Sequence, residues 1–190
     1  MKRLLSTMLF SLLAICSYAA INAQYTFESG MPDFISVNGD GKLESSTEKF
    51  KDGSRSVKFT WNAPSELVFS NFSDIKSSME VNGAGLMMWV YNAQPMKEPI
   101  VFTFLDWNMN EICHFDFNAD FKGWRAIWIK YIDMLSPYGH YGDRKLKERV
   151  TDAAGMIMKM PQSQQSGTIY IDRVTFSRAK LHNQITPDQQ

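Results

Sequence analysis

A run of basic residues follows a loop rich in tyrosine, and this part of the sequence offers the clearest candidates for a functional site. Segment 144–149 carries four positive charges and comes directly after loop 136–142. Trp107 stands in another polar segment, 106–110, where a buried Trp would be unusual. Aromatic faces suit sugar rings, while Arg and Lys pair with sulfate and carboxylate groups. The pattern favours a site for a sulfated glycan, made of Trp107, Tyr141, Arg144, Lys145, Lys147 and Arg149; the alternative is a solvated helix face.

The charge balance and the cysteines narrow the classes of function. Twenty basic and twenty acidic residues cancel, so no global field points to nucleic acid or to a membrane surface. Cys113 lies in the alternating run 111–117, which predicts a buried small hydrophobe rather than a reactive thiol. The other cysteine, Cys16, lies in the N-terminal apolar stretch, and no Cys/His pattern has zinc spacing.

The first 23 residues have the pattern of a signal peptide. Lys2 and Arg3 precede the apolar stretch 4–15, which is too short to span a bilayer, and small residues lead to Ala23. We therefore expect an exported protein, periplasmic or secreted, whose mature chain keeps only Cys113 and has no intrachain disulfide. The alternatives are an apolar N-terminal helix, or lipidation at Cys16, which Ile15 disfavours because a small residue is expected there.

Residues 24–178 read as one domain of short strands separated by turn residues. The clearest alternation is Val57, Phe59 and Trp61 on one face. Aromatic residues make up 13% of the chain, enough for a sandwich core and for a binding face. The expected strands are 25–28, 42–46, 56–61, 66–69, 85–91, 100–104, 113–118, 124–131, 156–160 and 168–177.

Three further expectations concern burial and one irregular segment. Strands 85–91 and 100–104 are nearly continuous apolar runs, which predicts central strands covered on both faces. Trp89, Trp124 and Trp128 stand in strands and are expected in the core. Residues 136–154 form an excursion with a helix, because Leu146 and Val150 have helical spacing in a polar segment.

Two motifs resemble a known family. Segments 121–126 (FKGWRA) and 167–177 (GTIYIDRVTFS) are similar to the N-terminal domain of bacterial chondroitin sulfate ABC lyases. The resemblance implies an all-β, galactose-binding-like jelly-roll β-sandwich ahead of a catalytic toroid, with 179–190 as a linker toward it. It also implies a non-catalytic module that orients chondroitin or dermatan sulfate or buttresses its own catalytic domain. A free-standing glycan-binding protein and a purely structural domain are the alternatives.

The resemblance places catalysis outside this domain. A lyase that removes the proton beside a uronate carboxylate needs a group that neutralises the carboxylate, a base and an acid. The family carries these groups beyond the domain that the motifs match, so we expect no catalytic residue here. Tyr138, His140, Tyr141 and Arg144 have suitable side chains, but a solvated aromatic loop is the favoured interpretation.

The resemblance also implies a structural cation between the first and last strands. Related sandwich modules bind it through backbone carbonyls and carboxylates, a ligand set that suits Ca²⁺ or Na⁺. The alternative is an ion pair between Asp172 and Arg173 or another basic group. The motif alignment gives the ligands as Thr26, Glu28, Arg55, Lys58 and Asp172.

Overall fold

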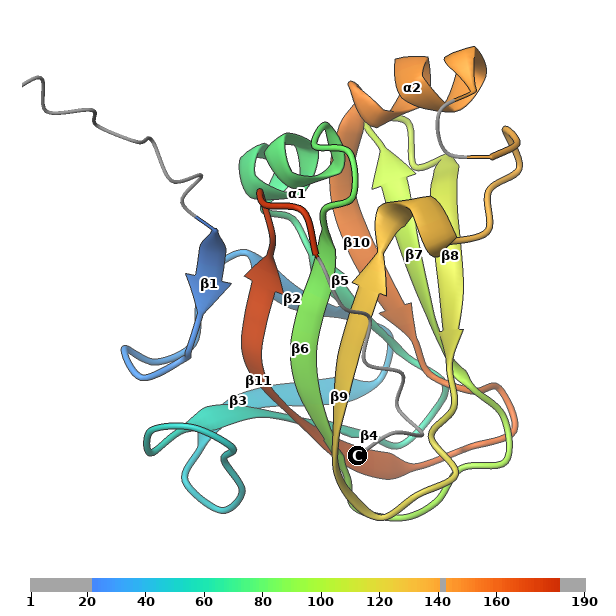
Figure 1. Ribbon diagram of the computed structural model, residues 1–190. Helices are drawn as coiled ribbons and strands as arrows, with labels where there is room; N and C mark the ends of the chain where they lie inside the picture. Colours follow the sequence, from blue (N-terminus) through green and yellow to red (C-terminus); the bar gives the residue numbers. More distant parts are fainter. Residues whose placement is uncertain (1–21, 141–142, 182–190) are drawn as a thin grey trace, which may run out of the picture.

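Two antiparallel sheets packed face to face make up the computed structural model, which describes residues 22–140 and 143–181 (Figure 1). This arrangement confirms the all-β sandwich predicted from the sequence. The first sheet has the order β3 (Gly41–Ser46), β4 (Ser56–Trp61), β11 (Gly167–Phe176), β6 (Gly85–Asn92) and β9 (Gly123–Lys130), and β1 (Ala23–Tyr25) pairs with β11. The second has the order β2 (Ile35–Asn38), β5 (Glu66–Phe69), β10 (Ala153–Lys159), β7 (Ile100–Asp106) and β8 (Glu111–Phe117).

The inner faces of the two sheets form the core. Val57, Phe59 and Trp61 of β4 are at most 2% exposed, so the predicted alternation is confirmed. In the second sheet Phe102 stacks on Phe115 with ring centres 4.6 Å apart. Stacked and edge-on aromatic pairs of this kind add to the free energy gained by area burial alone.

Helices lie at one end of the sandwich (Figure 1). They are α1 (Phe72–Met79), the 3-10 turn η1 (Tyr131–Asp133) and α2 (Arg144–Val150). Leu146 and Val150 are buried, which confirms the helix predicted from their spacing. The sequence analysis did not predict α1, whose Ile75 and Met79 are buried, or strand β2. No helix of 22–140 or 143–181 is long and apolar enough to cross a membrane.

The prediction of a fully covered β6 is wrong. Leu86, Met88 and Val90 point into the core, while Trp89 and Tyr91 alternate with them on the outer face and are half-buried. Trp124 and Trp128 of β9 share that face because they pair with Tyr91 and Met87, and both are half-buried. All three Trp residues expected in the core therefore lie on the outer face of the first sheet.

Candidate functional site

The carboxylate of Glu28 holds the loop between β3 and β4 from one side. It accepts hydrogen bonds from the backbone N–H of Ser54, from the Ser54 hydroxyl at 2.7 Å and from the backbone N–H of Arg55. The hydrogen bonds from Ser54 lower the pKa of Glu28. Gly53 is required beside it, since its φ is +67° and a Cβ would lie 2.3 Å from Glu28 Oε1.

Asp172 holds the same loop from the other side. Its carboxylate is buried and accepts the backbone N–H groups of Lys51 at 2.7 Å, Asp52 at 3.0 Å and Arg173 at 2.7 Å. Burial raises the pKa of Asp172, although these donors oppose the shift. The side chain of Arg173 pairs with Asp52 at 3.4 Å, so the expected alternative of an Asp172–Arg173 ion pair is not what the structure shows.

Strained backbone marks the place where these two carboxylates approach the loop. Phe27 and Arg173 have φ of +62° and +49°, values that cost free energy for residues other than Gly. Each is next in sequence to one of the carboxylates, Glu28 or Asp172. Such strain concentrates at ligand clamps and functional sites. We call Glu28, Asp172 and loop 51–55 the carboxylate clamp.

The clamp contains Glu28, Arg55 and Asp172, three of the five residues predicted to bind a cation. Arg55 donates to Glu28, and Thr26 follows β1, whose Tyr25 pairs with Val174 near Asp172. Lys58 lies apart, because it pairs with Glu44 and Tyr170 inside the first sheet and its carbonyl belongs to that ladder. The four other predicted residues would bind a cation through carboxylate and carbonyl oxygens, a ligand set that suits Ca²⁺ or Na⁺. No cluster of three His, Cys, Asp or Glu side chains occurs within 22–140 and 143–181, so a cation would depend on carbonyl ligands.

The structure brings one basic residue of the predicted glycan patch to the turn that carries Trp107, because Arg149 contacts Asp106. Trp107 is 59% exposed and packs on Phe72, with ring centres 4.8 Å apart. Arg149 is held by the buried Asp106 at 3.7 Å, and its guanidinium lies 5.2 Å from the centre of the Tyr138 ring. Two anchoring contacts make Arg149 a residue that fixes α2 to the sandwich rather than a free cation.

The other predicted members of the glycan patch lie on α2 or in the loop before it. Lys147 is exposed on α2. Arg144 and Lys145 begin the helix, but their side chains lie outside the described part of the structure, as does the whole of Tyr141. His140, which was considered for acid–base chemistry, is exposed, and its backbone N–H donates to Asp143 at 2.9 Å.

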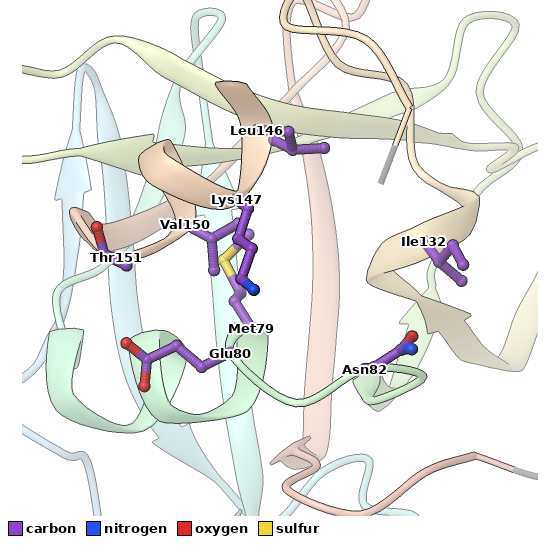
Figure 2. A pocket seen from close by; sticks show the side chains of 8 residues that line it. All are labelled: Met79, Glu80, Asn82, Ile132, Leu146, Lys147, Val150 and Thr151. Carbon is purple, nitrogen blue, oxygen red and sulfur yellow. The ribbon is translucent and has the colours of Figure 1, made fainter. Parts of the chain in front are cut away.

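A pocket of about 500 Å³ lies between α1 and α2. Met79, Leu146 and Val150 supply an apolar floor. Figure 2 shows Lys147 reaching from α2 into the space between the helices, with Glu80 on the α1 side. A lysine and a glutamate on one rim give the pocket no excess of positive charge. The full lining is Met79, Glu80, Asn82, Ile132, Leu146, Lys147, Val150 and Thr151.

The sequence analysis missed an aromatic surface. Trp89, Tyr91, Trp124 and Trp128 lie together on the outer face of the first sheet, as the register of β6 and β9 requires. The signal was present in the sequence, because Met87, Trp89 and Tyr91 occupy every second position. The run was taken as buried on both faces since Trp, Tyr and Met count as apolar.

Solved structures with the same architecture are carbohydrate-binding modules and a glycoside-degrading enzyme. The CBM22-1 xylan-binding domain of Paenibacillus barcinonensis Xyn10C has a TM-score of 0.52 at 13% identity, over 80% of this chain and 90% of that one. An exo-beta-agarase has a TM-score of 0.55 at 12% identity, over 84% of this chain and 25% of that one. These likenesses place the fold in the class of jelly-roll carbohydrate-binding modules.

The family is shown by sequence. A family model described as "Lyase, N terminal" matches residues 22–190, and the chain belongs to this family. Chondroitin sulfate ABC exolyase from Proteus vulgaris is 25% identical over 177 residues, which is 92% of this chain and 16% of that protein. The protein of the same description from Bacteroides thetaiotaomicron is 26% identical over 73% of this chain and 15% of its own length. The chain thus spans about a sixth of these relatives.

Proposed function

We propose that this chain is the non-catalytic N-terminal module of a glycosaminoglycan lyase and that it holds chondroitin or dermatan sulfate for the catalytic part. The observation that carries the proposal is the family match over residues 22–190, in relatives described as chondroitin sulfate ABC exolyases of which the chain spans about a sixth. The likeness to carbohydrate-binding modules supports a binding role. Catalysis is assigned to the remainder of the parent protein.

Export and a structural cation belong to the same proposal. A polysaccharide substrate lies outside the cytoplasm, which agrees with the signal-peptide pattern of 1–23 and with a periplasmic or secreted protein. A Ca²⁺ or Na⁺ ion in the carboxylate clamp would be held by Glu28, Asp172 and carbonyls of Thr26 and Arg55. Its part would be to neutralise two carboxylates that now rely on N–H donors.

A second candidate function is supported by the helical end of the sandwich. Most of the large apolar side chains that the sandwich exposes lie on or beside α1, η1 and the β7–β8 turn. They are 43–65% exposed: Phe72, Trp107, Met109, Ile132 and Leu135. Exposed apolar surface of this kind marks contacts with other proteins. The catalytic domain of the same parent protein is the partner that this surface would buttress.

Chondroitin sulfate affinity chromatography of the 190-residue chain tests the binding role. Affinity for a polyanion comes largely from ion pairs, which salt screens over a Debye length of about 8 Å at physiological strength. We expect retention at low salt and elution as salt rises. Passage through the column without retention at low salt contradicts the binding role and favours the buttress.

A further inference from the structure

A row of aromatic rings crosses three strands of the first sheet. Tyr170 of β11 pairs with Tyr91 of β6, which pairs with Trp124 of β9. Their ring centres lie 5.6 Å and 5.4 Å apart. Trp89 continues the surface along β6, and Trp128 continues it along β9. We call Trp89, Tyr91, Trp124 and Trp128 the aromatic platform.

Lysine side chains from the loop between β3 and β4 lie over this platform. The ammonium of Lys51 is 4.0 Å from the ring centre of Trp89, and that of Lys49 is 5.6 Å from Tyr91. Both side chains are exposed, and within 22–140 and 143–181 neither ammonium takes part in an ion pair. Lys58, in contrast, is bound to Glu48 at 2.8 Å. The platform therefore carries two cations that are available to a ligand.

A hollow adjoins the platform at Trp89 and Trp128. Trp89, Trp128, Met87 and Arg173 line this hollow of about 310 Å³. The indole N–H of Trp128 is buried and has no acceptor within the described chain, so one donor at this face is unused.

We propose that the aromatic platform with Lys49 and Lys51 is the glycan-binding surface of this module. It would take an acidic polysaccharide, with carboxylate or sulfate groups paired to the two lysines above Trp89 and Tyr91 and with sugar rings packed beside these lysines on the exposed parts of the platform. The inference rests on the proposed function and names its site. The rival surface on α2 carries Arg149, which is held by Asp106, and Lys147, which shares its pocket with Glu80.

Three double variants of the 190-residue chain separate the surfaces. Lys49→Met/Lys51→Met removes the platform charges and keeps the stems over the rings. Trp107→Ala/Lys147→Ala removes the rival surface. Lys97→Met/Lys159→Met is the matched control, because it removes two exposed lysines away from both surfaces. The probe is a chondroitin sulfate oligosaccharide titrated by calorimetry at low salt, and melting curves verify that each variant is folded.

The platform variant should bind at least about tenfold more weakly than wild type, because it loses both cations that pair with the polyanion. The other two variants should bind within about twofold of wild type. Tyr91→Leu adds a variant that leaves every charge in place and should also weaken binding. Unchanged binding by the platform variant, with loss in the Trp107/Lys147 variant, overturns this inference but leaves the proposed function. Absence of binding by wild type overturns both.

Discussion

The backbone N–H of Lys51 lies 2.7 Å from the carboxylate of Asp172. The ammonium of the same lysine lies 4.0 Å from the ring centre of Trp89. Asp172 of the last strand therefore fixes the backbone of this loop, and the Lys51 side chain of the loop reaches over the outer face of the first sheet. This contact connects the carboxylate clamp to the aromatic platform, so that whatever stabilises the clamp also positions the lysine.

The buried carboxylate of Asp172 should make stability depend on pH. Burial raises its pKa in the folded state above the ordinary value of about 3.9. A raised acidic pKa means that its contribution to stability is full below that ordinary value and is lost as pH rises through the folded pKa. The free energies of unfolding are measured in urea with chelator and without Na⁺. The value for wild type relative to that for Asp172→Asn should fall as pH rises across this window.

Glu28 supplies a control, because its effect on the pH dependence of stability has the opposite sign. Hydrogen bonds from Ser54 lower its pKa, so its contribution is present above the unfolded pKa and is lost as pH falls through the folded value. Wild type relative to Glu28→Gln should therefore gain stability as pH rises. Equal slopes for the two comparisons would contradict the assigned environments of both carboxylates.

A cation in the carboxylate clamp should stabilise the folded chain by mass action. At about a hundred times the dissociation constant the gain is about 2.7 kcal/mol. Titration with Ca²⁺ and, separately, with Na⁺ should raise the melting temperature of wild type and leave Asp172→Asn unchanged. If the melting curves are identical across both titrations, hydrogen bonds alone hold the clamp.

Leu146 should anchor α2. Its side chain is 3% exposed beside Val150, and a Leu→Ala change in a packed site costs about 2–5 kcal/mol. Lys147→Ala, one position along and exposed, should change the free energy of unfolding by less than about 0.5 kcal/mol. Chemical unfolding of both variants measures the difference. Similar values would show that the helix contributes little to the core.

The chain alone should have no lyase activity. The chain spans about a sixth of the exolyases that it matches, and the proposed function assigns catalysis to the remainder of the parent protein. Incubation with chondroitin sulfate, followed by ultraviolet absorbance of the unsaturated uronate product, should give a flat trace. A steady rise that Tyr141→Phe abolishes would contradict the assignment of catalysis to another domain.

Strand positions were predictable because alternation and turn residues are local signals. Ser56–Trp61 and Glu66–Phe69 have the predicted bounds, and seven other predicted strands overlap one in the structure, whereas predicted strand 25–28 shares only Tyr25 with β1. Helix α1 was missed because Asn71 and the polar residues that follow resemble a turn, while its burial depends on β10, far along the chain. Such tertiary support cannot be read from local propensity.

The face that a strand presents was harder to predict than the strand itself. Trp89 and Tyr91 are apolar enough for a core, and the pairing of Tyr91 with Tyr170 and Trp124 shows that their side of β6 is an aromatic outer surface. Motif spacing points to Asp172 because it fixes β11, whereas the position of Lys58 inside the ladder depends on the register of β4, which the sequence does not show. The contact of Arg149 with Asp106 is not visible in the sequence, because Asp106 ends β7, 43 residues earlier in the chain.

The indole N–H signals of the five Trp residues test the central claim most directly. Two-dimensional NMR of the chain, titrated with a chondroitin sulfate oligosaccharide, reports on each ring separately, and single Trp→Phe variants assign the signals. The account predicts shifts for Trp89, Trp124 and Trp128 on the platform, and little change for the buried Trp61 and for Trp107 beside Phe72. Shifts confined to Trp107 would contradict the account and move the glycan to the helical end of the sandwich.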